Sequence, residues 1–175
     1  HLNRDQNHLQ LVKYDAVNGK KIKVLFEETD AEFVEPEHGP IFLSNNNEEF
    51  LWYSERDGWN HLYLYDIEGN LIRQVTNGNW VVLNVEAVLE NEIFITSTME
   101  TPLETHLYKV DLNSLGIKHL TNINANHSVQ INFNGEYVLD SYSSYSIPRK
   151  IDIIDKNGKL IENIFEADNP LAEYK

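Results

Sequence analysis

The stretch SERDGWNHLYLYDIEGNLIRQVTNG, from Ser54 to Gly78, carries the signals that decide the fold. Two short runs, HLYLYD and LIRQVT, lie on either side of a Gly69-Asn70 turn. In the first run the two leucines point to one side of an extended chain and the two tyrosines to the other, which is the pattern of a half-buried strand. The Gly-Asn pair supplies the positive φ angle of a tight turn. The stretch therefore predicts an antiparallel β-hairpin that follows a charged loop.

The same hairpin pattern recurs along the chain. Each copy has a run that ends in an apolar residue and an aspartate, followed by a turn signal and a second run. The four runs are HLQLVKYD (His8 to Asp15), HLYLYD (His61 to Asp66), HLYKVD (His106 to Asp111) and RKIDIID (Arg149 to Asp155). Their final aspartates are 51, 45 and 44 residues apart. A period of about 40–50 residues is typical of propeller blades or of solenoids, and solenoid repeats of this length are mostly helical.

Two further strand candidates precede each of the last three copies. They are PIFL (40–43) with EFLWYSE (49–55), VVLNVEAV (81–88) with EIFITST (92–98), and SVQINF (128–133) with EYVLDSY (136–142). Four antiparallel strands in about 45 residues are what a propeller blade requires. We therefore predict an all-β fold, a partial β-propeller with three complete four-stranded antiparallel blades at residues 31–79, 80–123 and 124–168. A truncated blade at residues 1–30 precedes them.

A propeller closes with about four to eight blades, and closure protects the edges of its sheets. We therefore expect this stretch not to close by itself and to leave an edge prone to pairing with another chain. The sequence starts at His1 and its one methionine is Met99. We expect it to be a piece of a longer protein whose targeting signal lies elsewhere.

Composition limits the classes of partner. The chain has 175 residues, with 14 Lys and Arg against 28 Asp and Glu, and a formal net charge of −14. Such an acidic surface repels phosphate backbones and anionic lipids, which argues against nucleic acid and membrane surfaces as partners. No apolar run approaches the roughly 20 residues that span a bilayer. The sequence has no cysteine, so it offers neither a disulfide nor a thiolate metal site.

Ser54, Asp57 and His61 suggest a catalytic triad at first sight. The nucleophilic serine of an α/β-hydrolase lies in a strained G-x-S-x-G turn, and this motif does not occur in the sequence. His61 recurs as His106 and as His8, each time before a leucine at the same repeat position. We therefore predict that these histidines have a structural role, such as binding a backbone group at a strand start, and we assign no catalytic residue.

Other repeated residues also have structural interpretations. We expect Trp52 and Trp59 to fill the wedge between neighbouring sheets rather than to stack on a ligand. We expect the repeated aspartates to accept backbone N–H groups in the hairpin turns. They are Asp15, Asp66, Asp111 and Asp155.

The segment TDAEFVEPEHGP, Thr29 to Pro40, is the best candidate for a ligand-facing region. It is the longest connection between blades and leads into an innermost strand, which in a propeller faces the central channel. An ordinary acidic linker is the simpler alternative. The paired acids Glu27-Glu28 and Glu48-Glu49 suit an amine or a divalent ion in principle. No Asp-x-Asp-x-Asp-Gly or His-x-x-x-His spacing occurs, so we predict neither a metal site nor a cofactor.

SERDGWNHLYLYD, followed by GNLIRQVTNGNW, VEAV and HLYKVD, resembles the propeller of the dipeptidyl peptidase IV family of serine peptidases. LNRDQNHLQLVKYD is similar to the preceding blade of bacterial members. The resemblance implies the last blades of an eight-bladed propeller. It also implies that residues 169–175 begin a linker to an α/β-hydrolase domain, which carries the catalytic Ser, Asp and His. The glutamate pair that binds the substrate's amine lies in an earlier blade of the family.

The same resemblance implies that the whole protein releases dipeptides from polypeptide N-termini, often after proline. This chain would be inactive, would wall the substrate cavity, and would contribute to a homodimer surface. Some members place an aromatic and a basic residue from the segment equivalent to Thr29–Pro40 near the substrate. Glu37 and His38 fall closest to those positions and are the implied substrate-pocket residues. The implied location is periplasmic, cell-surface or secreted.

Two other functions are compatible with a propeller. One is a free-standing module that binds protein or carbohydrate. The other is a sialidase, whose S-x-D-x-G-x-x-W box is not met by SERDGWN because Asp57 falls one position late and Trp59 directly follows the glycine.

Overall fold

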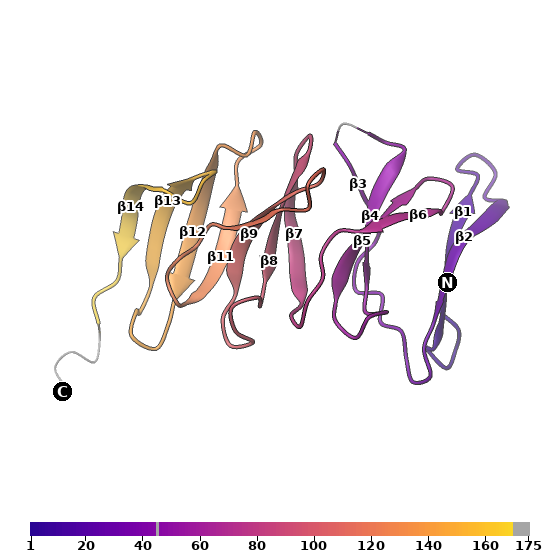
Figure 1. Cartoon of the computed structure of the whole chain (residues 1–175), viewed down its shortest axis with the longest axis horizontal. Helices are drawn as coiled ribbons and strands as arrows, with labels where there is room; N and C mark the ends of the chain where they lie inside the picture. The colour runs from indigo at the N-terminus through magenta and orange to yellow at the C-terminus, as the bar shows by residue number, and fades with distance from the viewer. Residues whose placement is uncertain (45, 170–175) are drawn as a thin grey trace. The chain divides into compact units, whose positions relative to one another are not determined.

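The structure is a computed structural model that describes residues 1–44 and 46–169, and every helix or strand assigned in these ranges is a β-strand (Figure 1). The predicted all-β class is therefore confirmed. Of the expected linker, only Asn169 is described, and residues 170–175 lie outside the described residues.

The strands form one two-stranded and three four-stranded antiparallel sheets. The first sheet pairs β1 (His8–Tyr14) with β2 (Lys21–Thr29), and the second contains β3 (Ile41–Phe42), β4 (Glu49–Ser54), β5 (His61–Asp66) and β6 (Leu71–Gln74). The third contains β7 (Val82–Val88), β8 (Glu92–Ser97), β9 (His106–Asp111) and β10 (Ile117–His119). The fourth contains β11 (Asn126–Ile131), β12 (Tyr137–Ser143), β13 (Lys150–Asp155) and β14 (Leu160–Glu166).

Strands are neighbours in each sheet in the order in which they follow one another along the chain. Each sheet is thus a simple up-and-down meander, as expected for three complete blades and a shorter one. The chain divides into two compact units. His1–Asn79 contains the first and second sheets, and the unit that begins at Trp80 contains the third and fourth.

The central strand β5 differs from the half-buried strand that its alternation predicts. All of its residues from His61 to Tyr65 are buried, so both faces of the strand are covered. Tyr63 and Tyr65 pack with Phe50 of β4 and with Leu9 of the first sheet, while Leu62 and Leu64 are buried on the opposite face. The alternation of tyrosine and leucine therefore marks two different buried faces, and an outer strand such as β14 is the exposed one.

The core of the second unit joins its two sheets. Phe94 and Leu107 of the third sheet pack against residues of the fourth sheet. The buried members of this cluster are Phe94, Leu107, Leu120, Val129, Val138 and Ile154. Burying a side chain of this size contributes about 1.5–3 kcal/mol, so this contact is a main source of stability for the unit.

The hairpin turns show why the Asp-then-Gly pattern recurs. The Asp66 carboxylate accepts the backbone N–H groups of Glu68 and Asn70 at 2.9 and 2.8 Å, and Gly69 takes a φ of +87°. In the looser NSLG turn, Leu115 rather than the glycine takes the positive φ, at +59°. The turn aspartates thus bind the backbone even where a residue other than glycine takes the positive φ angle.

Candidate functional site

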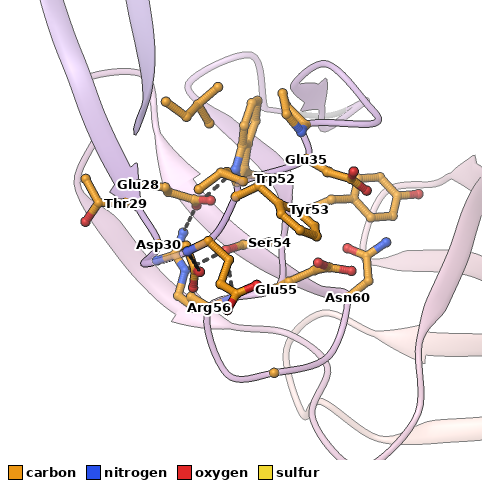
Figure 2. Close-up of a pocket in the computed structure, with 16 residues that line it drawn as sticks. Glu28, Thr29, Asp30, Glu35, Trp52, Tyr53, Ser54, Glu55, Arg56 and Asn60 are labelled. Atoms are coloured by element: carbon orange, nitrogen blue, oxygen red, sulfur yellow. Dashed lines mark hydrogen bonds and ion pairs between the residues drawn. The ribbon is translucent and has the colours of Figure 1, made fainter. Parts of the chain in front are cut away.

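A cavity of about 290 Å³ lies in the first unit beside the segment Thr29–Pro40. Its walls come from the end of β2, from that segment, from β4 and from the loop between β4 and β5 (Figure 2). The segment predicted to face a ligand therefore borders a cavity in the structure.

Glu28 at the end of β2 is the centre of the cavity's polar network. Its Oε1 accepts a hydrogen bond from Trp52 Nε1 at 3.2 Å and another from Arg56 Nη2 (Figure 2). Arg56 Nε also donates to Ser54 Oγ at 2.9 Å. Only 12% of the Glu28 side chain is exposed, so this carboxylate is held in one position by donors from β4 and from the loop after it.

The other side of Arg56 packs on aromatic rings. Its guanidinium lies 4.2 Å from the centroid of Tyr63 and 5.6 Å from that of Tyr65, a cation–π arrangement. Burial, assisted by the negative charge of Asp57, raises the pKa of Tyr63 to about 12. Burial also raises the pKa of Tyr65, against the opposing effect of Arg56. Both phenols are therefore neutral at pH 7, and Arg56 is fixed between neutral rings and a carboxylate.

The lining of the cavity is suited to binding a positively charged ligand. Its acidic lining residues outnumber its one cation, Arg56, and aromatic side chains form part of the wall. The acids are Glu28, Asp30, Glu32, Glu35 and Glu55, and the aromatic residues are Phe33, Trp52 and Tyr53. A peptide segment with a positive charge matches such a lining through ion pairing and ring stacking.

The serine at the cavity does not form a triad with His61. The Ser54 hydroxyl accepts the Arg56 Nε–H, and both ring nitrogens of His61 face other groups. His61 Nδ1 lies 3.1 Å from Thr76 Oγ1, and Nε2 lies 2.9 Å from the carbonyl oxygen of Gly78. With these partners His61 connects its strand to the segment after β6.

His106 occupies the same place in the third sheet that His61 occupies in the second. Its Nδ1 lies 3.1 Å from the Thr121 carbonyl oxygen and 3.3 Å from Thr121 Oγ1. Both histidines are at most 1% exposed. His8, the third member of the repeat, differs because its side chain is 38% exposed and pairs with Glu27 at 2.6 Å. Two of the three repeat histidines are therefore buried connectors.

The turn aspartates and tryptophans have distinct surroundings. Asp111 accepts the N–H groups of Asn113 and Ser114, and Asp155 accepts those of Asn157 and Lys159. Hydrogen bonding lowers the pKa values of Asp66, Asp111 and Asp155. Trp52 is buried between the first and second sheets. Trp59 is 40% exposed, so it does not fill the wedge expected for it, because it lies in the loop beyond the Asp57-Gly58 turn.

The two residues implied as substrate contacts lie beside the cavity rather than among its lining residues. Glu37 borders a separate hollow of about 330 Å³ together with Leu2 and Gln6. The ring of His38 packs against that of Tyr53, a cavity residue, with centroids 4.3 Å apart. Their contact with a substrate stays a prediction.

The pairing of Glu28 with Arg56 does not follow from the sequence. Glu28 stands there only as one of two adjacent acids, and Arg56 only as a charged residue of the loop SERDGWN, with no role assigned to it. The one available signal is a cation directly after a strand in a strongly acidic chain.

Two absences apply to residues 1–44 and 46–169. No group of three or more His, Cys, Asp or Glu in these ranges is arranged to hold a metal ion. Nor does this part of the chain contain a helix with the length and apolar character that crossing a bilayer requires.

Consecutive four-stranded meanders that pack face to face within a unit define a protein of the β-propeller class. The chain matches the family model described as dipeptidyl peptidase IV (DPP IV) N-terminal region over residues 1–149, and it belongs to this family.

Individual relatives agree with the family model. The chain is 28% identical over 145 residues to the dipeptidyl peptidase 4 of Arthroderma otae, an alignment that covers 74% of this chain and 19% of the relative. A solved Bacteroides ovatus structure, assigned as a dipeptidyl aminopeptidase IV, superposes with a TM-score of 0.90 at 30% identity. The match covers 98% of this chain and 27% of that one. The fold is also that of Porphyromonas gingivalis dipeptidyl peptidase 4, with a TM-score of 0.83, 24% identity and coverage of 94% and 24%. The chain spans about a fifth of the length of the curated relatives it matches.

Proposed function

We propose that this chain is a non-catalytic part of the propeller of a bacterial DPP IV-like serine peptidase. In the whole protein it would wall the substrate cavity and limit access to the N-termini of peptides. The family match over residues 1–149 is the observation that carries the proposal. The sequence contains no G-x-S-x-G motif, which fits a catalytic centre supplied by another domain. The free-standing binding module is not favoured by these relatives.

The cavity around Glu28 supports a role as part of a wall that contacts a peptide substrate. Its carboxylate and the Arg56 guanidinium are held by each other and by Trp52, so they need no reordering when a ligand arrives. A rigid wall loses little side-chain entropy on binding. Phe33 is 56% exposed at the edge of the same cavity and offers an apolar contact.

The partners and the location of the whole protein are part of the proposal. They are a peptide substrate, a C-terminal α/β-hydrolase domain and a second copy of the protein in a homodimer. The location is the periplasm, the cell surface or the medium. These statements rest on the resemblance to the family.

The first test compares the isolated chain with the protein encoded by the full reading frame. Gly-Pro-p-nitroanilide is the substrate. We expect the 175-residue chain to release no p-nitroaniline and the full-length protein to release it. Turnover by the isolated chain that survives repurification would contradict the non-catalytic assignment, and an inactive full-length protein would contradict the peptidase assignment.

The second test addresses the wall. In the full-length protein, Phe33→Ala and Glu35→Gln are expected to raise KM for a ten-residue peptide and to leave KM for the dipeptide nitroanilide unchanged. For Glu37→Gln and His38→Gln, KM for the same two substrates is measured to test whether these neighbouring positions also contact the longer peptide. Glu48→Gln is the matched control, since Glu48 lies at the exposed turn before β4. Equal changes in KM for both substrates would refute the proposal that this wall contacts longer peptides.

A further inference from the structure

Three histidines meet where the third and fourth sheets pack together in the second unit. His106 lies on β9, His119 ends β10 and His127 lies on β11. The centroid of the His106 ring is 4.8 Å from that of His119 and 5.2 Å from that of His127. Tyr108 stacks on His119 at 4.7 Å, and Tyr142 packs against His127 at 5.0 Å. We call His106, His119 and His127 the histidine seam.

The seam holds the segment that joins the two sheets, residues 120–125. His106 Nδ1 lies within 3.3 Å of both oxygens of Thr121, and Thr121 Oγ1 accepts the N–H of Leu107 at 3.0 Å. His127 Nε2 donates to the carbonyl oxygen of Ile123 at 2.8 Å. His119 borders one hollow together with Asn122 and Asn124 of the segment. Hydrogen bonds from two of the imidazoles hold the segment, and the third imidazole lies beside it.

One member of the seam is buried against a carboxyl group. His127 Nδ1 lies 2.9 and 2.8 Å from the two oxygens of Asp140, and its Nε2 faces the Ile123 carbonyl. A carbonyl oxygen only accepts hydrogen bonds, so Nε2 donates to it. The side chains of His127 and Asp140 are 1% and 4% exposed. Both ring nitrogens of His127 thus have partners within the seam.

His106 has an acidic partner of its own. Its Nε2 lies 3.2 Å from Glu104 Oε2, and the Glu104 side chain is 22% exposed. The Tyr142 hydroxyl, on the far side of His127, donates to Asp152 Oδ2 at 2.8 Å. Glu104 and Asp152 thus pair with His106 and Tyr142, respectively, and neither is a partner of His119.

His119 lacks such a partner. Its Nε2 is buried without a hydrogen bond, and its Nδ1 is 3.7 Å from Glu100 Oε1, which belongs to a half-exposed side chain. Burial lowers the pKa of His119 most, and repulsion from His106 and His127 adds to this against the attraction of Glu100. A proton on His119 would therefore place a positive charge on a ring whose buried Nε2 has no acceptor and which lies beside the ring of His106.

We propose that the histidine seam is an acid-sensitive joint: when His119 takes up a proton, residues 121–124 leave the space between the sheets, while Leu120 stays in the core and the sheets themselves stay folded. Release lets the buried Nε2 of His119 reach water. The two sheets remain joined at β11, where the backbone N–H of His127 donates to the Thr105 carbonyl at 3.0 Å. The device is a local opening of a connecting segment, separate from the cavity of the first unit.

The direction of the pH effect follows from linkage. The closed form binds the His119 proton more weakly than the open form, in which the ordinary histidine pKa of about 6.5 applies. The opening equilibrium is therefore constant above that pH and shifts toward the open form as pH falls below it. Each unit by which the closed form lowers the pKa of His119 makes opening about tenfold more favourable at low pH.

Hydrogen exchange read by mass spectrometry on the 175-residue chain tests the joint. Rates at pH ~7.5 and pH ~5.0 are corrected for the intrinsic pH dependence of exchange. We expect residues 121–124 to lose protection at the lower pH, and the protection of β4 to stay unchanged. In His119→Gln, whose amide cannot take up the proton, protection at the lower pH should match that at the higher pH. His8→Gln, a substitution at an exposed histidine of the first unit, should respond as the unmodified chain does.

Three outcomes would overturn the joint. They are unchanged protection of residues 121–124, a loss that persists in His119→Gln, and an equal loss across all of β11–β14, which would mean that the whole sheet unfolds. If His119→Gln is poorly folded, NMR of the unmodified chain decides instead. The amides of residues 121–124 must then change with the same pH midpoint as the His119 ring, and a different midpoint refutes the proposal.

Discussion

Gly69 offers a sharp test of how the blades contact each other. It has a φ of +87°, and a Cβ built on it would lie 2.3 Å from the carbonyl oxygen of Leu25 in β2. The tip of the β5–β6 hairpin therefore rests directly on the backbone of the first sheet. Gly19 provides the matched control in the same compact unit, because it has a φ of +69° and a Cβ added there would meet no atom within 4 Å apart from its chain neighbours.

The expected magnitudes follow from these two environments. Gly69→Ala and Gly19→Ala both place an L-residue at positive φ, which costs about 1–2 kcal/mol. Both also restrict the unfolded chain, which offsets about 0.4–1 kcal/mol. Of the two variants, only Gly69→Ala pushes the hairpin turn away from the backbone of Leu25. Overpacking of this kind costs about 1–3 kcal/mol more. The difference between the two variants, about 1–3 kcal/mol, isolates the contact between the sheets.

Urea denaturation followed by far-ultraviolet circular dichroism measures this difference. With a slope of about 2 kcal/mol/M, the midpoint for Gly69→Ala should lie roughly 1 M below that for Gly19→Ala. Equal midpoints for the two variants would refute the reasoning, since the close approach to Leu25 would then carry no energy. Gly158, whose Cβ would lie 2.4 Å from the Leu120 carbonyl oxygen, repeats the arrangement in the second unit.

Three further predictions concern the core, the cavity and the turns. Phe94→Ala empties a fully buried position between the third and fourth sheets and should lower the free energy of unfolding by about 3–5 kcal/mol, measured by urea denaturation. Arg56→Lys keeps the charge but not the planar stacking on Tyr63, so it should not restore the Tm lost in Arg56→Ala, and full recovery would contradict the stacking role. Hydrogen bonds lower the pKa of Asp66, so the folded chain binds its proton less readily than the unfolded chain. The stability that Asp66 provides is therefore present above about pH 4 and lost as pH falls further, and Asp66→Asn should lower Tm at neutral pH and flatten its decline in acid.

The repeat was predictable because the signals that indicate it lie in neighbouring residues. Alternation, an Asp at the strand end and a glycine or asparagine in the turn are local properties, so the sequence alone indicated the hairpins and their period. Local signals could not decide how many faces of a strand are buried. HLYLYD alternates like a half-buried strand, yet both of its faces are buried from His61 to Tyr65.

The candidate site was predictable only in part. The length of the segment Thr29–Pro40 indicated where a cavity would lie, and the structure has one there. The residues that organise it were not predictable, because Glu28 lies 24 residues from Trp52 and 28 from Arg56 along the chain. Trp59 shows the opposite error, since a tryptophan near a strand is expected to be buried and this one is exposed beyond the turn.

The sequence by itself determined the class of fold, the repeat and the family resemblance, because each depends on residues within one hairpin and on their spacing. Only the tertiary structure decided which side chains meet: Glu28 with Arg56 across two sheets, and His106, His119 and His127 across two others. Such meetings depend on strand register and on how sheets stack, and a stretch of sequence read on its own contains neither.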